Sequence, residues 1–126
     1  MPTVLIVDDC RAVRKTLRTL LEKHLPSVVC TEAINGLDAI GKTKESCPDL
    51  IILDLGMPGM NGFEAATILH KAKPQVPVFM FTSHDSHEVE SQAASAGILA
   101  VFSKYTGLNA LLARVTELLD PSHVLA

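Results

Sequence analysis

Residues 50–54 read LIILD, a run of four aliphatic residues that ends in an aspartate. A short continuous apolar run is typical of a strand that is covered on both faces, as in a parallel α/β sheet. Three other runs lead into polar residues in the same way: VLIV at 4–7 into Asp8 and Asp9, VFMF at 78–81 into Thr82 and Ser83, and LAVFS at 99–103 into Lys104. The sequence therefore predicts four buried strands that each end in polar side chains.

The alternation of strand and helix patterns predicts one α/β domain. We expect strands over about 3–7, 28–31, 50–53, 78–81 and 99–103. Helices are expected between them and after the last one, ending near 25, 46, 72, 96 and 119. Five such units with right-handed crossovers give a flavodoxin-like, doubly wound five-stranded parallel sheet of order 2-1-3-4-5, with helices on both faces.

Two of the helices carry local signals worth testing. Asn61 followed by Glu64 has the spacing of a capping box and predicts a helix that runs to about Ala72. The helix expected over 86–96 offers only Val89 and small alanines as apolar contacts, so we expect it to pack weakly.

Length and composition limit the number of domains and the classes of partner to expect. The chain has 126 residues, of which 48% are hydrophobic, with a formal net charge of −3. We therefore expect a single domain over 1–126, with a core over about 3–119 and a short C-terminal tail. The acidic balance gives no electrostatic basis for binding nucleic acid. We expect neither a membrane span nor a signal peptide, and the three cysteines, which lack C-x-x-C spacing, indicate reduced thiols in the cytoplasm.

Carboxylates from two neighbouring strands are expected to meet at one edge of the sheet. In the order 2-1-3-4-5 the switch point lies between the first and third strands, which end in Asp8, Asp9 and Asp54. Carboxylates at close quarters repel one another unless a cation compensates them, and oxygen ligands suit Mg²⁺ or Mn²⁺ rather than zinc. An aspartate held there can attack a phosphoryl group to form an acyl phosphate, with Lys104 and Thr82 stabilising the transferred charge.

Each of these residues also has an ordinary interpretation. Asp9 could cap the first helix, Thr82 could simply end a strand, and a single lysine such as Lys104 is usually solvated. Their joint occurrence at the ends of four strands favours the functional interpretation.

The chain resembles the receiver domain of two-component response regulators over its whole length. The resemblance is carried by VDD at 7–9, DLGMPGMNG at 54–62, the pair Thr82-Ser83, and Lys104. It implies that Asp54 is the phosphoacceptor and that Asp8, Asp9, Asp54 and the carbonyl of Gly56 hold Mg²⁺. It also implies that Lys104 contacts the phosphoryl group and that Thr82 and Phe102 form a switch pair.

The resemblance further implies a signalling module rather than an enzyme. Its phosphoryl donor would be a sensor histidine kinase or a phosphotransfer protein. Its switched surface would comprise the helix near 86–96, the strand near 99–103 and the last helix, and would bind an output partner or a second copy. Many receivers have proline after the active-site lysine, whereas this chain has Tyr105, so we expect a trans bond there.

In lacking that proline and in carrying MPGMNG at 57–62, the chain resembles receivers attached to LuxR-type helix-turn-helix domains, which points to transcriptional regulation. Because the chain ends soon after the last helix, it is expected to be either a single-domain regulator or the receiver part of a longer protein.

Two other functions were weighed. A Mg²⁺-dependent phosphohydrolase of the haloacid-dehalogenase type also uses an aspartate nucleophile, but it carries a second aspartate two residues later, where this chain has Gly56. No insertion is present that could form a substrate cap. A receiver that serves only as a binding scaffold is disfavoured because every residue of the predicted site is intact.

Some features stay open. Arg11, Arg14, Lys15 and Arg18 form a basic stripe that could be a solvated face or a docking surface for a kinase. His84 and His87 could suggest a metal, but without a third ligand nearby they are interpreted as surface residues.

Overall fold

Five parallel strands form one sheet in the order β2-β1-β3-β4-β5. The computed structural model describes residues 1–120. Its strands are β1 (Thr3–Val7), β2 (Val29–Ala33), β3 (Leu50–Leu53), β4 (Val78–Thr82) and β5 (Ala100–Ser103). The predicted flavodoxin-like topology is therefore confirmed. The expected C-terminal tail after residue 120 lies outside the described residues.

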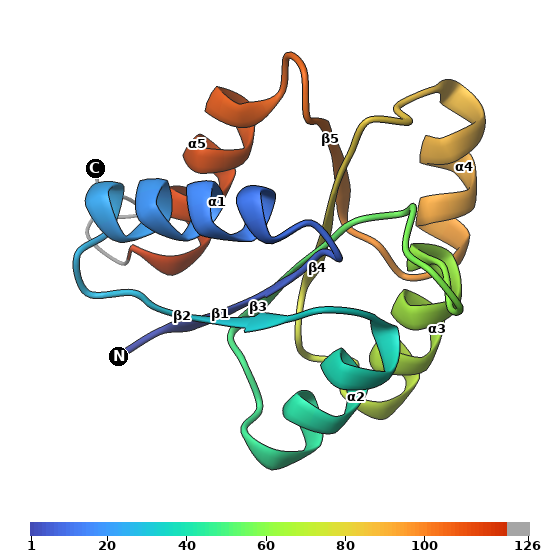
Figure 1. Ribbon diagram of the computed structural model, residues 1–126, viewed down its shortest axis with the longest axis horizontal. Helices are drawn as coiled ribbons and strands as arrows, with labels where there is room; N and C mark the ends of the chain where they lie inside the picture. The colour runs from blue at the N-terminus through green and yellow to red at the C-terminus, as the bar shows by residue number, and fades with distance from the viewer. Residues whose placement is uncertain (121–126) are drawn as a thin grey trace.

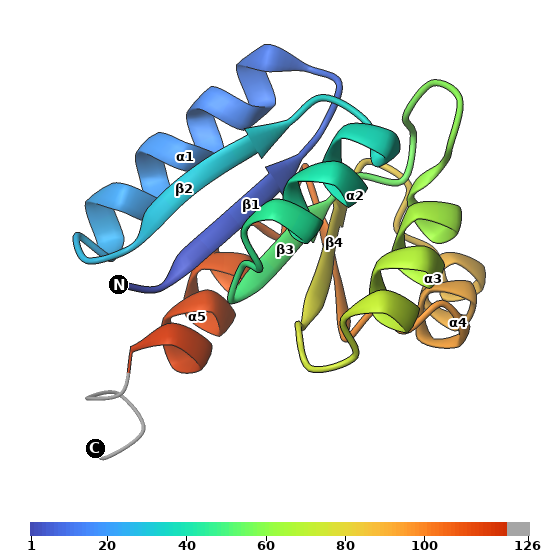
Figure 2. The same ribbon diagram turned by 90° about the horizontal axis from the view of Figure 1, so that it is seen from below.

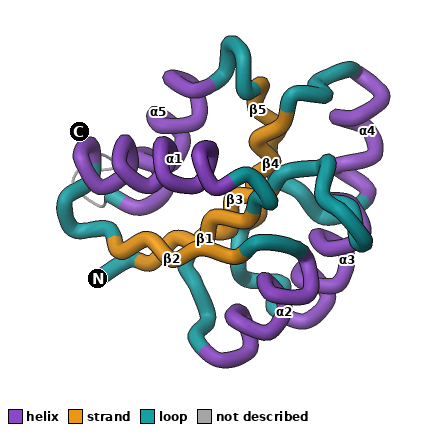
Figure 3. The backbone as a smooth tube through the Cα atoms, in the orientation of Figure 1, coloured by secondary structure: helices purple, strands orange, loops and turns teal. Residues whose placement is uncertain are grey.

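Helices cover both faces of the sheet, as Figures 1 and 3 show. They are α1 (Arg11–His24), α2 (Gly36–Glu45), α3 (Gly62–Ala72), α4 (His87–Ser95) and α5 (Leu108–Leu119). Helices α1 and α5 pack on one face, whereas α2, α3 and α4 pack on the other; Figure 2 shows the same layers from below. Within residues 1–120, no helix is both long enough and apolar enough to cross a membrane.

The runs in β1, β3 and β4 are continuously apolar because these strands bury side chains on both faces. In β1, Val4 and Ile6 join the core beneath α1 and α5, and Leu5 and Val7 join the core beneath α2, α3 and α4. Alternate residues of a strand point to opposite faces, so a strand covered on both sides has no polar position to spare. In these strands polar residues are therefore confined to the ends, whereas the edge strand β2 carries Thr31 and Glu32 along its length.

The observed elements differ from the expected ones in detail. β2 runs from Val29 to Ala33, and Leu99 lies before β5 with 59% of its surface exposed. Leu37 is 70% exposed, because α2 buries the small side chains of Ala39 and Thr43 instead. The Lys104–Tyr105 bond is trans, as expected.

The start of α3 is set against the backbone that follows β3. The predicted capping box is confirmed: the Asn61 side chain accepts from the Glu64 amide at 2.9 Å, and the Glu64 carboxylate accepts from the Asn61 amide at 3.1 Å. The next residue, Gly62, lies so close to β3 that a Cβ there would be 2.4 Å from the Asp54 carbonyl oxygen and 2.7 Å from Leu55 Cα. The first turn of α3 therefore supports the peptide that carries Asp54.

Gly62→Ala should test this close approach. The added methyl group must displace the backbone at Asp54 or move α3, so we expect a loss of about 1–3 kcal/mol in the free energy of unfolding. Gly41→Ala is the matched control, because nothing lies within 4 Å of a Cβ in that helical position. It should stabilise the protein by roughly 0.5–1 kcal/mol. Urea unfolding measures both, and equal effects of the two substitutions would contradict the packing described.

Candidate functional site

Three carboxylates meet where β1 and β3 end. These strands are neighbours, and the Asp54 amide donates to the Val7 carbonyl at 3.0 Å just beyond the last paired residues. The side chains of Asp8, Asp9 and Asp54 bring ligand atoms within 4.8 Å of one another. The expected convergence of the three acids is therefore observed.

The three carboxylates differ in what holds them. Asp8 is buried; its Oδ1 accepts from the Cys10 amide at 2.9 Å and its Oδ2 accepts from Lys104 Nζ at 2.8 Å. Asp54 is also buried and has its Oδ2 at 3.2 Å from Lys104 Nζ, while its Oδ1 is enclosed without a hydrogen-bond partner among residues 1–120. Asp9 is exposed at the mouth of the site.

One ammonium compensates two buried carboxylates. Lys104 follows β5, and its own amide donates to the Thr82 carbonyl at 2.9 Å, which brings the side chain over the end of β4. Burial raises the pKa of Asp8, although Lys104 beside it acts in the opposite direction. Burial by itself would lower the pKa of Lys104, but the adjacent Asp8 and Asp54 outweigh it and raise that pKa. Lys104 is therefore firmly protonated, and the cluster still carries excess negative charge.

The donor set fits a hard divalent cation such as Mg²⁺. All the side-chain ligands offered are carboxylate oxygens, which Mg²⁺ prefers, and it usually takes only one or two of them. Both oxygens of Asp8 are already engaged, so the carboxylate of Asp9 and Oδ1 of Asp54 remain for the ion. An enclosed carboxylate oxygen without a partner is costly unless something binds it.

Two loops frame the mouth of the site. Thr82 is fully buried at the end of β4, and its Oγ1 accepts from the His84 amide at 3.2 Å. Gly56 lies in the loop after β3, where a Cβ would have only His84 Nε2 near it, at 4.0 Å. His84, which sequence reasoning interpreted as a surface residue, is exposed but stands over this mouth.

Thr82 and Phe102, the switch pair that the resemblance implies, lie on opposite faces of the sheet. Phe102 pairs in register with Phe81 and packs in the core beneath α1 and α5, with its ring edge-on to Phe79 at 5.4 Å between centroids. Thr82 is two residues after Met80, which lies in the core beneath α2, α3 and α4. The Thr82 side chain therefore points to the same face as Met80, opposite to that of Phe102. Phe102 cannot fill space behind Thr82 without crossing the sheet. Val101, half-buried, packs on the Thr82 face instead.

The basic stripe of α1 is largely engaged within the fold. Arg14 Nε lies 3.0 Å from Glu32 Oε1 and Arg18 Nη1 lies 2.8 Å from Glu32 Oε2. Arg14 also donates from Nη1 to the carbonyl oxygen of Asp8 at 2.8 Å. Sequence reasoning missed this link to the acid cluster, because helical spacing does not tell which arginine can reach across to β2.

Comparison with known proteins identifies the family. The sequence profile of the response regulator receiver domain matches residues 4–116. The response regulator protein VraR of Staphylococcus aureus is 38% identical over 103 residues, which are 82% of this chain and 49% of VraR. The chain belongs to the response regulator receiver domain family of two-component systems.

Solved structures agree with this assignment. Chemotaxis protein CheY4 of Vibrio cholerae has a TM-score of 0.85 at 26% identity, covering 94% of this chain and 99% of that one. Response regulator TrrA of Thermotoga maritima, solved in complex with Mg²⁺-BeF, has a TM-score of 0.84 at 27% identity, covering 94% of this chain and 100% of that one. The chain spans about half the length of curated relatives such as VraR.

Lys104→Met should destabilise the protein in a pH-dependent way. Removing the ammonium leaves two buried carboxylates unpaired, which should cost on the order of 3 kcal/mol near pH 7. Because burial already raises the pKa of Asp8, the folded state then binds more protons than the unfolded state, so the deficit should shrink as the pH falls toward about 4. Urea unfolding at pH 8 and pH 5 measures this. Lys71→Met, on the exposed surface of α3, is the control, and a deficit of equal size at both pH values would contradict the model.

Proposed function

We propose that Asp54 accepts a phosphoryl group, with Mg²⁺ held by Asp9 and Asp54 and assisted by Asp8 and the carbonyl of Gly56. The observation that carries this proposal is the enclosed, unpartnered Oδ1 of Asp54 beside two further carboxylates and one ammonium. The Mg²⁺-BeF complex of TrrA, a relative of the same fold, supports the choice of ion. Mn²⁺ would satisfy the same oxygen ligands.

The residues divide the chemistry between them. A carboxylate oxygen of Asp54 attacks the phosphorus atom as the bond to the donor nitrogen breaks. When the other ring nitrogen of the donor imidazole is protonated, this step leaves an acyl phosphate on Asp54 and a neutral imidazole on the donor. Lys104 exchanges its contact with Asp54 Oδ2 for one with a phosphoryl oxygen. Mg²⁺, when bound, offsets charge on the phosphoryl oxygens. Thr82 is the hydroxyl donor at the neighbouring strand end.

A haloacid-dehalogenase-type hydrolase is not supported. The position two residues after Asp54 is Gly56, which cannot act as an acid or base. The β3–α3 connection, 54–61, forms no cap domain over the site. The family match over residues 4–116 favours a signalling module whose product is a conformation.

The donor is proposed to be the phosphohistidine of a sensor kinase or of a phosphotransfer protein. It would approach over the first turns of α1, beside the exposed Asp9. Arg14 and Arg18 are ion-paired with Glu32, so only Arg11 and Lys15 of the basic stripe remain exposed without an ion pair within residues 1–120. A docking surface for the donor on α1 would therefore offer fewer unpaired basic residues than the stripe of four suggests. The three free cysteine thiols support the proposal that the protein acts in the reducing cytoplasm.

Acetyl phosphate with Mg²⁺ should phosphorylate the protein once. The product, detected by intact mass and labile to hydroxylamine, should be absent in Asp54→Asn and present in the control Asp49→Asn, whose carboxylate accepts from the Thr3 amide at the opposite edge of the sheet. Asp9→Asn should raise the Mg²⁺ concentration needed for half-maximal labelling by at least about tenfold. Labelling that persists in Asp54→Asn would defeat the assignment.

Phosphorylation is proposed to switch the surface formed by α4, β5 and α5. Rotation of Thr82 toward the phosphoryl group would take Oγ1 away from the His84 amide, which leads directly into α4. The Val101 side chain on this face is β-branched, so its rotation is restricted. The conformational change would therefore be transmitted through the β4–α4 loop rather than by rotation of an aromatic ring. α4 is held mainly by Ala93, Ala96 and partly buried Val89. A second copy of this chain or an output partner would bind this surface. The relative VraR is about twice as long as the segment that matches this chain, and transcription is the proposed output.

Beryllofluoride with Mg²⁺ should reproduce the switch. Amide NMR spectra should show large shifts at His84 and through α4, because the hydrogen bond from the His84 amide to Thr82 is broken. Thr82→Val, which is similar in shape but lacks the hydroxyl, should still bind beryllofluoride near Asp54 yet leave α4 unshifted, while Thr82→Ser should respond like wild type. Shifts in α4 that persist in Thr82→Val would refute this route.

A further inference from the structure

The guanidinium of Arg14 joins the acid cluster to the outer strand of the sheet. Its Nη1 donates to the carbonyl oxygen of Asp8 at 2.8 Å, and its Nε donates to Glu32 Oε1 at 3.0 Å. Only 11% of the Arg14 side chain is exposed. A nearly buried arginine with two differently directed hydrogen bonds is held in one orientation, unlike a surface ion pair.

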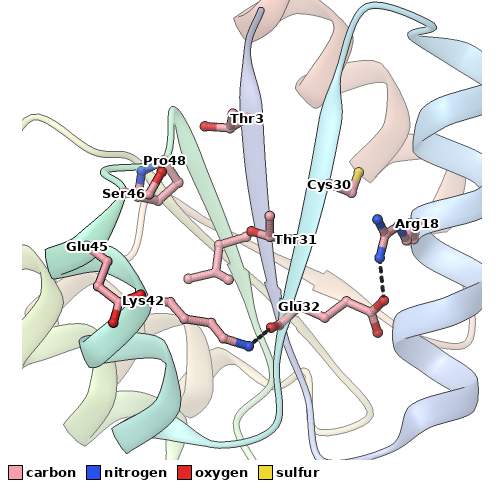
Figure 4. Close-up of a pocket in the computed structure, with 10 residues that line it drawn as sticks. Thr3, Arg18, Cys30, Thr31, Glu32, Lys42, Glu45, Ser46 and Pro48 are labelled. Atoms are coloured by element: carbon pink, nitrogen blue, oxygen red, sulfur yellow. Dashed lines mark hydrogen bonds and ion pairs between the residues drawn. The ribbon is translucent and has the colours of Figure 1, made fainter.

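Glu32 is itself fixed on β2. Its second carboxylate oxygen accepts from Arg18 Nη1 at 2.8 Å, and its backbone carbonyl accepts from Lys42 of α2. Figure 4 shows Arg18 and Lys42 reaching Glu32 from opposite sides of the strand, around a cavity of about 500 Å³. The hydrogen bonds from Arg18 and Arg14 lower the pKa of Glu32, so its carboxylate stays charged well below neutral pH.

The carbonyl that Arg14 holds belongs to the peptide unit between Asp8 and Asp9. A peptide unit is planar, so fixing its oxygen fixes the plane and with it the direction in which the next residue leaves the chain. Asp9 is exposed, and its carboxylate accepts no hydrogen bond from another residue within 1–120. Its direction is therefore set by the backbone that Arg14 orients.

We propose that Arg14, anchored by Glu32, is a positioning residue for the divalent cation, because it orients the Asp8–Asp9 peptide and thereby aims the Asp9 carboxylate. This inference rests on the proposed metal site. Arg14 touches neither the ion nor the phosphoryl group; it acts through the backbone of Asp8. A residue on the outer strand, Glu32, would thus influence how tightly the acid cluster binds metal.

The sign of the effect separates positioning from electrostatics. Removing a cation beside three carboxylates should, by Coulomb's law alone, make the cluster bind a divalent cation more tightly. Losing the orientation of Asp9 should make it bind more weakly. Arg14→Gln therefore gives opposite results under the two mechanisms. Arg18→Gln is the matched control, because it removes another ion pair to Glu32, of 2.8 Å against 3.0 Å for Arg14, from the same helix without touching Asp8.

Mn²⁺ is a suitable probe, since the electron paramagnetic resonance signal of the free ion reports its binding to the full chain. We expect Arg14→Gln to raise the Kd for Mn²⁺ by about tenfold, the effect typical of losing an outer-shell partner of a metal ligand. Arg18→Gln should stay close to wild type. The double variant Arg14→Gln/Glu32→Gln should be no weaker than Arg14→Gln, because both substitutions break the same connection. An unchanged or lower Kd in Arg14→Gln would overturn the proposal.

Spectra of the metal-free protein give a second readout that does not depend on the ion. The amide signals of Asp9 and Cys10 should move in Arg14→Gln and stay in place in Arg18→Gln. If Arg14→Gln fails to fold, Glu32→Gln, which keeps Arg14 but removes its anchor, replaces it in both measurements. Wild-type protein that does not bind Mn²⁺ would defeat the proposed metal site. Unmoved amides of Asp9 and Cys10 would defeat the role of Arg14, whatever the metal result.

Discussion

The ion pairs of Lys104 with Asp8 and Asp54 are the contact on which the rest of this site depends. They join the ends of β1, β3 and β5. In the sheet, β3 and β5 lie on opposite sides of β4. One ammonium cannot neutralise three carboxylates, so the cluster is left with a net negative charge. It also keeps one enclosed oxygen, Oδ1 of Asp54, for which residues 1–120 offer no hydrogen-bond partner. This incomplete compensation is what suits the pocket to the divalent cation and the phosphoryl group proposed for it.

The parallel sheet can accommodate this cluster of charged side chains. In β1, β3 and β4 both faces are packed, so this part of the sheet is apolar, and the carboxylates and Lys104 lie beyond the carboxyl ends of the strands. The carboxylates then sit on short connections that rigid strands hold from one side. Contacts such as Gly62 against the Asp54 carbonyl and Arg14 on the Asp8 carbonyl hold them from the other.

The two faces of the sheet have separate roles in this chain. The face beneath α1 and α5 holds the aromatic residues Phe79, Phe81 and Phe102, which make a packed and static layer. The other face carries Thr82, Val101 and the small-residue contacts of α4. The conformational change proposed to start at Thr82 would therefore act on α4, whose core contacts are mainly small residues, on its own side of the sheet and not on the aromatic layer of the other face.

The sequence by itself determined the sheet, its order and the convergence of the acids with Lys104. Apolar runs of four or five residues ending in polar side chains permit few other folds, and the ends of parallel strands must meet at one edge. It also determined the capping box at Asn61, because that signal is local. It did not place Phe102, since a shift of one residue in a strand exchanges the two faces and an apolar strand buried on both sides does not reveal which is which. Nor did it separate Arg14 from the other basic residues of α1. Only the tertiary structure decided that, because the reach of a side chain to a backbone carbonyl depends on how the helix lies on the sheet.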